Sequence, residues 1–257
     1  MVSRLSGWTK SAVFEVQEYV RLCRAAVIAC ISKPFYYTDV IQQFGALGLG
    51  SLTVVILTGF FTGAVLALNS GITLDQFGAR EFVGRLVSAS MVKALGPVLT
   101  GLMLAGRVGS GIAAELGSMV VTDQINALRA LGTDPIRKLV APRLLAGFFM
   151  TPVLTIIADA VGILGGWLIA VAQLRVPSSL YWSSILEGLY IQDVWQGLIK
   201  PFFLGFVIVT IGCHVGLRTS GGTQGVGRAT TNAVVAASVA VIAVDFFLTR
   251  LLFTLLY

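Results

Sequence analysis

Charged residues are scarce in this sequence. Only 12% of its 257 residues are Asp, Glu, Lys or Arg, whereas soluble domains carry about 25%. Hydrophobic residues make up 56% of the chain, and its mean hydropathy is +0.88. This composition excludes an ordinary soluble domain and indicates an all-α integral membrane protein. The net charge of +6 needs no nucleic acid to explain it, because basic loops suit anionic lipid headgroups.

Cysteine and histidine are also rare. Cys23, Cys30 and Cys213 form no Cys-x-x-Cys pair, so they are interpreted as small buried thiols. His214 is the only histidine and has no companion Asp, Glu or Cys motif. The sequence therefore predicts neither a metal site nor a catalytic dyad.

Motifs of lipid-modifying enzymes and of ATPases are missing as well. The chain contains no His-Glu-x-x-His, no Gly-x-Ser-x-Gly and no Gly-x-x-x-x-Gly-Lys-Ser/Thr phosphate loop. We therefore predict that the chain is not an enzyme, that it holds no cofactor, and that any ATP is hydrolysed elsewhere.

Long apolar segments dominate the sequence. A bilayer core takes about 20 apolar residues per helix, and no charged residue lies between Asp39 and Asp75. Lys93 and Arg107 interrupt the second segment, but about 21 Å of helix separates them, so each can extend towards its own membrane surface. Five spans are predicted, at 44–68, 86–113, 142–172, 194–216 and 230–256, within one domain that covers 1–257.

Basic residues indicate the orientation, because the cytoplasmic segments of such proteins carry the excess of Lys and Arg. With the N-terminus inside, five spans leave the C-terminus outside, and eleven inner cations outnumber five outer ones. The inner set is Arg4, Lys10, Arg21, Arg24, Lys33, Arg129, Arg137, Lys138, Arg143, Arg218 and Arg228, and the outer set is Arg80, Arg85, Lys93, Arg175 and Lys200.

The segment 9–32 is predicted to form an amphipathic helix that ends before Pro34. Its apolar side chains recur at helical spacing, and polar residues occupy much of the other face. Such a helix either lies flat at the membrane interface or packs on another subunit. The apolar positions are Val13, Val16, Val20, Cys23 and Val27.

Glycine pairs four residues apart occur in three spans. These small-xxx-small pairs let helix backbones approach closely. We expect tight helix packing at these positions, with self-association as a further alternative. The pairs are Gly59 with Gly63, Gly162 with Gly166, and Gly212 with Gly216.

A polar segment at 114–141 separates the second and third spans. Val121, Ile125 and Leu128 recur at helical spacing, which predicts a helix that lies on the membrane or presents a face to a partner.

The residues that follow predict a helix stop and a new start. Gly132 suits a C-terminal cap, Thr133 or Asp134 an N-cap, and Pro135 the first turn of a helix. Rigid helix-turn-helix geometry of this kind suits the transmission of force.

Two carboxylates lie inside predicted spans, where an unpaired charge is costly. Asp159 and Asp245 each pair with a cation, accept helix hydrogen bonds or stay protonated. Arg250 is poorly phased to pair with Asp245 on the same helix, so we expect a partner on another helix.

Four motifs occur in order along the chain: Leu-Gly-Pro-Val at 95–98, Ala-Gly-Arg-Val-Gly-Ser-Gly at 105–111, Asp-Gln-Ile-Asn-Ala-Leu-Arg-Ala-Leu-Gly-Thr-Asp-Pro at 123–135, and Gly-Val-Gly-Arg-Ala-Thr-Thr at 225–231. Together they resemble the MlaE (YrbE) family of ABC-transporter permeases. The resemblance runs from the N-terminal helix to the C-terminus.

The resemblance implies a homodimeric permease of the bacterial inner membrane. Combined with the orientation that the basic residues indicate, this predicts a cytoplasmic N-terminus and a periplasmic C-terminus. Its implied partners are a cytoplasmic ABC ATPase that carries the ATP and Mg, a periplasmic MCE-domain lipid carrier and, in some systems, a STAS-domain protein. The implied function is phospholipid transport for outer-membrane lipid homeostasis and asymmetry.

The resemblance also assigns sites. The segment 114–141 becomes the cytoplasmic coupling segment, and its predicted ATPase-coupling residues are Glu115, Asp123, Gln124, Leu128 and Arg129. The predicted lipid-binding residues are Leu66, Leu74, Phe77, Lys93 and Leu95.

One departure from the family concerns Lys93 and Ala94, which stand where relatives often carry Arg-Glu. Lys93 either attracts a lipid phosphate or extends to the headgroups. The competing function is a proton-coupled secondary transporter of a lipid or amphiphile that uses Asp159 and Asp245 and needs no ATPase.

Overall fold

The computed structural model describes the backbone of residues 2–32 and 36–256, and the side chains of 13–32 and 36–255. Helices account for nearly all of this part of the chain, and no strand occurs in it. In chain order the elements are α1 (Val2–Ile31), α2 (Tyr37–Phe44), η1 (Gly45–Leu49), α3 (Gly50–Asp75), η2 (Arg80–Phe82), α4 (Val83–Ser90), η3 (Met91–Leu95), α5 (Gly96–Leu104), η4 (Ala105–Gly109), α6 (Ser110–Val121), α7 (Gln124–Ala130), η5 (Ile136–Val140), α8 (Ala141–Ala172), α9 (Ser178–Gly188), α10 (Ile191–Leu217) and α11 (Gly222–Leu256).

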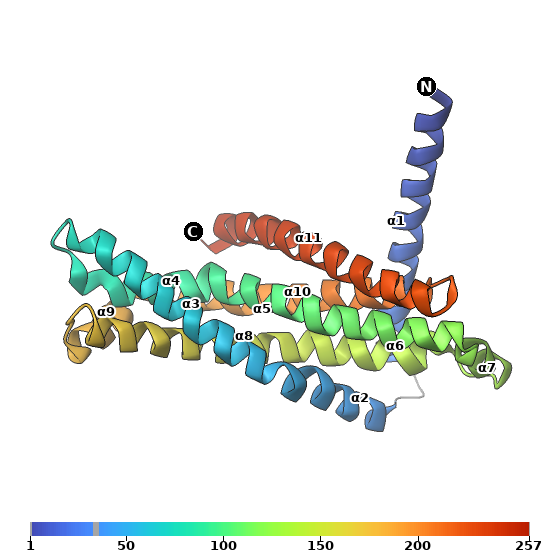
Figure 1. Cartoon of the computed structure of the whole chain (residues 1–257), viewed down its shortest axis with the longest axis horizontal. Helices are drawn as coiled ribbons and strands as arrows, with labels where there is room; N and C mark the ends of the chain where they lie inside the picture. The colour runs from blue at the N-terminus through green and yellow to red at the C-terminus, as the bar shows by residue number, and fades with distance from the viewer. Residues whose placement is uncertain (1, 33–35, 257) are drawn as a thin grey trace.

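The long helices run side by side as a bundle, and α1 crosses the bundle axis at one end (Figure 1). The short helix α7 lies at the end where α1 attaches, and α9 lies at the opposite end (Figure 1). We call these the α7 end and the α9 end. Successive long segments run in alternating directions, because each connection reverses the chain at one of these two ends.

Five helical segments of the described chain are long and apolar enough to cross a membrane. They cover 37–75, 80–121, 136–172, 191–217 and 222–255, so the five predicted spans are confirmed as helices. Lipid offers no hydrogen bonds to a backbone, so an apolar segment that crosses it must satisfy its N–H and C=O groups within a helix.

Glycines let α3 and α8 approach at backbone distance. A methyl group at Gly63 would overlap the carbonyl oxygen of Gly162, and one at Gly59 would lie 2.8 Å from the carbonyl oxygen of Ala158. Two of the predicted glycine pairs therefore pack against each other within one chain. The third pair, at the end of α10, packs against Gly109 and Ala113 in the same way.

In the second and third spans, a π-helical turn precedes a proline that interrupts helical hydrogen bonding. The turn η3 immediately precedes Gly96 and Pro97, and the Gly96 N–H donates to the carbonyl of Met91, five residues back. In the third span, η5 precedes Ala141 and Pro142 in the same arrangement. Such one-turn π-bulges widen the helix and accommodate the proline rings.

The helix α1 contacts α8, η5 and α10, and of the predicted apolar face only Cys23 is half-buried. Ala26 and Ala29 are buried against the bundle, whereas Val13, Val16 and Val20 stay exposed. The Tyr19 hydroxyl shares a 2.7 Å hydrogen bond with Thr210, and burial raises the pKa of Tyr19 to about 12. The valine face is therefore free to contact either a membrane surface or another subunit.

Candidate functional site

A buried polar cluster surrounds the Leu-Gly-Pro motif of the second span. Pro97 has no N–H, so the carbonyl of Lys93, four residues earlier, lacks its helical donor. The ammonium of Lys200 on α10 donates to that carbonyl at 2.7 Å. The approach of the two helices requires Gly197, because a methyl group there would overlap the carbonyl of Val92. Lys200 of α10 thus supplies the hydrogen bond that Pro97 removes from the second span.

The same ammonium pairs with the last span. Lys200 Nζ lies 3.3 Å from the Asp245 carboxylate, and the Lys200 side chain is fully buried. The expectation that Asp245 finds a cation on another helix is confirmed. The placement of Lys200 on an external segment is wrong, because its charge is neutralised inside the bundle. This pairing favours a structural role for Asp245 over proton transport.

Lys93 extends its side chain in another direction. Its ammonium lies 2.7 Å from the carboxylate of Asp193, which is buried at the start of α10. A second Asp193 oxygen accepts the backbone N–H of Tyr190 at 3.3 Å. Lys93 is therefore held by an ion pair at the α9 end, and its half-exposed side chain leaves the ammonium partly accessible.

Asp159 on α8 explains the glycine of the Leu-Gly-Pro motif. A methyl group at Gly96 would overlap an oxygen of this carboxyl group. That oxygen has no hydrogen-bond partner within the described residues. Asp159 also lines a mostly apolar cavity of about 270 Å³, whose walls include Val92, Ile163 and Val194.

The structure divides the predicted lipid-binding residues. Leu66, Leu74 and Leu95 pack against one apolar cluster that includes Val87 and Tyr181. Phe77, in contrast, is 77% exposed in the connection between α3 and η2. Of this set, Phe77 and Lys93 are the side chains most accessible from outside the bundle.

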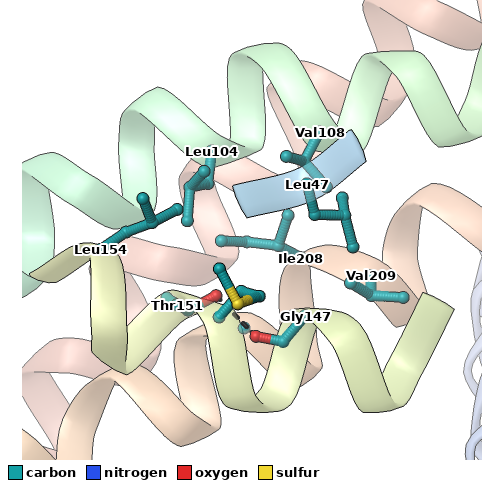
Figure 2. A pocket seen from close by; sticks show the side chains of 10 residues that line it. Leu47, Leu104, Val108, Gly147, Thr151, Leu154, Ile208 and Val209 are labelled. Atoms are coloured by element: carbon teal, nitrogen blue, oxygen red, sulfur yellow. Dashed lines mark hydrogen bonds between the residues drawn. The ribbon is translucent and has the colours of Figure 1, made fainter. Parts of the chain in front are cut away.

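The centre of the bundle is filled by side chains. Leu47, Leu104, Leu154 and Ile208 surround an apolar void between η1, α5, α8 and α10 (Figure 2). Its volume is about 10 Å³, which is room for about one water molecule. This void cannot hold an acyl chain.

The polar segment between the second and third spans forms the α7 end. The predicted helix through Val121 is wrong in one respect: it breaks at Thr122, and Asp123 adopts a left-handed conformation with φ of 63°. Asp123 precedes α7, and its carboxylate accepts a hydrogen bond from the Asn126 amide at 2.7 Å. The tolerance of Asp for this conformation allows the sharp change of direction.

The predicted stop and restart after α7 are confirmed. Gly132 has φ of 75°, its N–H donates to Arg129, and the Thr133 N–H donates to Leu128 at 3.0 Å. These two bonds form a Schellman motif. Asp134 then accepts the N–H of Ile136 at 2.9 Å and starts the next helix.

The predicted coupling residues on α7 are mostly exposed. Asp123, Asn126 and Arg129 form a ladder along one face, since Arg129 donates to the Asn126 side chain at 3.3 Å. Gln124 is exposed and Leu128 is half-buried. This face exposes charged and amide groups at the end of the bundle.

Glu115 links α6 to α8 instead of standing alone. Its carboxylate lies 2.8 Å from a guanidinium nitrogen of Arg143, and Arg143 is buried. Arg143 also donates to the Leu139 carbonyl at 2.6 Å. The two helices that flank α7 are therefore joined by an ion pair, and Arg143, which was counted among the inner cations, is buried within the bundle.

Sequence reasoning missed Asp193 and the ion pair of Arg143, and it misassigned Lys200. The signal that could have found them is a charge within or beside an apolar span, because such a charge needs a partner. Hydropathy does not report how the helices are shifted along one another, so the ion-pair partners of these residues could not be predicted.

Five helices long and apolar enough to cross a membrane, a proline-interrupted second span and an exposed helical element between the second and third spans describe a multi-pass membrane protein. Residues 40–251 match the family described as permease MlaE. The chain belongs to this family.

Individual relatives extend the match over most of the chain. A probable ABC transporter permease protein of Rickettsia typhi is 42% identical over 228 residues, which are 89% of this chain and 88% of the relative. The intermembrane phospholipid transport system permease protein MlaE of Haemophilus influenzae is 37% identical over 229 residues, or 88% of each chain. Protein TRIGALACTOSYLDIACYLGLYCEROL 1, chloroplastic, of Arabidopsis thaliana is 33% identical over 88% of this chain and 65% of its own length.

Proposed function

We propose that this chain is the permease subunit of an ATP-driven transporter that moves phospholipid between the bacterial inner membrane and a periplasmic MCE-domain carrier. The observation that carries the proposal is membership of the MlaE family across 40–251. The Haemophilus influenzae relative is named for intermembrane phospholipid transport, and we extend that function to this chain. The consequence for the cell is outer-membrane lipid homeostasis.

The proposed assembly contains two copies of this chain. The central void is too small for cargo, and α11 leaves Val239, Ile242 and Phe246 exposed along its length. A second copy facing this chain supplies the other wall of a lipid cavity. An ABC ATPase with bound ATP and Mg, an MCE-domain carrier and, in some systems, a STAS-domain protein complete the complex.

The α7 end is proposed to face the cytoplasm and to receive the ATPase. Backbone hydrogen bonds in the turns on both sides of α7 hold it rigidly, and the Glu115–Arg143 pair joins the helices that flank it. A movement of the ATPase against α7 would then displace α6 and α8 together. Both helices continue towards the α9 end, where α5 and α8 surround the Leu-Gly-Pro cluster.

Charge reversal at Arg129 tests the coupling role. We expect Arg129→Glu to lower ATP-dependent lipid transfer at least about tenfold, because a like charge placed in a polar interface costs over about 1.4 kcal/mol. The measurement is lipid transfer and ATP hydrolysis by the complex reconstituted in vesicles. Arg129 is exposed, so insertion and folding of the chain should not change.

Arg175→Glu is the matched control, because Arg175 is exposed between α8 and α9 at the opposite end of the bundle. Equal transport by both variants, with unchanged ATPase association, would remove α7 from the coupling path.

Photo-crosslinking tests the cargo site. A photoreactive residue at Phe77 or Lys93 should label phospholipid at least about fivefold more than one at Leu66, because only accessible side chains reach a substrate that stays partly in the membrane. Leu164, half exposed on the outer side of α8, is the control for general lipid contact. Labelling at Phe77 no stronger than at Leu164 would exclude it from the site.

Native mass spectrometry of the complex purified from its own host tests the proposal as a whole. Two copies of this chain with two ATPase subunits and retained phospholipid are expected. Reproducible transport activity without an ATPase would overturn the proposal in favour of a secondary transporter.

A further inference from the structure

A polar cavity of about 500 Å³ lies at the α7 end, between α1, the end of α10 and the start of α11. Its wall carries two guanidinium groups, from Arg218 and Arg228, and one carboxylate, from Glu15. Thr219, Ser220 and Asn232 add hydroxyl and amide groups to the same wall. This cavity is far from the Leu-Gly-Pro cluster and has no part in the proposed coupling path.

An apolar groove of about 300 Å³ adjoins this cavity. Leu22 and Ala25 of α1, Ile136 of η5 and Leu217 of α10 form its walls. His214 and Arg218 line both spaces, so they separate a polar compartment from an apolar one. A polar compartment beside an apolar compartment fits an amphiphile.

The wall between the two compartments is held in place by the packing of α1. Arg218 pairs with Glu18 of α1 at 3.2 Å. The His214 ring packs edge-on against Tyr19, with 5.5 Å between the ring centroids. The hydrogen bond between Tyr19 and Thr210 adds a third contact between α1 and α10.

The charges of the polar cavity indicate the headgroup. Glu18 neutralises Arg218, which leaves Arg228 and Glu15 as the two groups that can bind a ligand. Within the described residues, Arg228 has no ion-pair partner. A guanidinium group binds phosphate in a bidentate manner, and a carboxylate binds an ammonium group. One positive and one negative group on a single wall therefore complement a zwitterion.

The cavity also has the right location for a lipid. The five spans align the bundle axis with the membrane normal, and α1 runs across that axis near the start of α11 (Figure 1). Residues of both helices line the cavity. With α1 parallel to the membrane surface, Glu15 and Arg228 lie at the depth of the headgroups.

We propose that the polar cavity and the adjoining groove together bind a zwitterionic phospholipid of the leaflet at the α7 end, with phosphate on Arg228, ammonium on Glu15 and an acyl chain along Leu22 and Leu217. This site is separate from the cargo site proposed near Phe77, and it does not depend on transport activity. A bound lipid fixes α1 to α10 and α11.

The experiment uses the full chain in vesicles that contain phosphatidylethanolamine with a photoreactive acyl chain. Labelled peptides are mapped by mass spectrometry. We expect labelling around Leu22 and Leu217, and Arg228→Gln should lower it about tenfold, since one charge-assisted phosphate contact contributes that much to affinity. Arg250→Gln, an exposed cation at the far end of the same helix, should change it less than about twofold.

Glu15→Gln distinguishes the headgroup class. It should weaken labelling by phosphatidylethanolamine about fivefold and leave labelling by phosphatidylglycerol with the same chains unchanged, because only the former carries an ammonium group. Labelling near Phe77 serves as an internal reference, so failure of the cargo site is scored separately.

Three results would overturn the proposal. The first is equal labelling of the Arg228 and Arg250 variants. The second is full competition by glycerophosphoethanolamine or inorganic phosphate at the concentration of the lipid, which would make this a site for a soluble headgroup or a free phosphate and not for a membrane lipid. The third is loss of labelling only together with a change in oligomeric state, which would assign the cavity to a contact with a second copy.

Discussion

Replacement of Lys200 by methionine is expected to lower the free energy of unfolding by about 3–5 kcal/mol, because removing one member of a buried ion pair leaves the other charge uncompensated. Methionine keeps the length of the side chain but removes its charge and its hydrogen bond. The Asp245 carboxylate and the Lys93 carbonyl would then both lack their partner. The measurement is unfolding of the purified chain in mixed micelles, followed by circular dichroism.

A double-mutant cycle separates the two contacts of Lys200. Asp245→Asn alone removes the charge pair, and Lys200→Met with Asp245→Asn should recover about 1–3 kcal/mol relative to Lys200→Met, because no unpaired charge remains. Arg250→Met on the same helix as Asp245 is the control for loss of an exposed cation. A Lys200 variant as stable as the Arg250 variant would show that the cluster around Pro97 contributes nothing to the fold.

Addition of one methyl group at Gly63 is expected to destabilise the protein by about 3 kcal/mol, the upper end of the range for overpacking. The new carbon would overlap the Gly162 carbonyl oxygen, and that atom belongs to a helix backbone. A backbone atom cannot rotate away as a side chain does, so α3 and α8 must separate and lose contacts along their length. Gly63→Ala is measured by the same unfolding assay.

Gly111→Ala is the matched control, since Gly111 also lies within a helix but has open space where the methyl group would go. There the substitution should stabilise the helix by about 0.5–1 kcal/mol, because alanine loses less conformational entropy than glycine on folding. Similar effects of the two substitutions would contradict backbone contact between α3 and α8.

Several elements were predictable because their physical cause is local. The Gly132 turn is one example: a left-handed residue and an N-cap two positions later depend only on neighbouring backbone and side-chain atoms. The break at Asp123 was not predicted, because Asp is also compatible with the helix interior and no glycine or proline marks that position. The face of α1 that packs on the bundle was not predicted; it contains the small residues Ala26 and Ala29, which allow closer approach than valines do.

The candidate site was predictable only in part. The expectation of a partner for Asp245 on another helix followed from the cost of a charge in lipid. The identity of that partner, Lys200, depends on how far α10 is shifted along α11, and hydropathy does not report such shifts. The coupling role of α7 and the lipid-binding role of Phe77 and Lys93 stay predictions.

The sequence alone determined the number of spans, their helical nature and the family, because lipid forces each apolar segment to satisfy its own backbone and because the motifs are contiguous. Only the tertiary structure decided which glycines meet, which carbonyl Lys200 caps and which charges remain available at the α7 end. These depend on how residues as far apart as Lys93 and Lys200, which share a hydrogen bond, or Glu15 and Arg228, which line one cavity, are brought together. Such contacts are set by the relative rotation and shift of whole helices, which side-chain packing across the bundle selects.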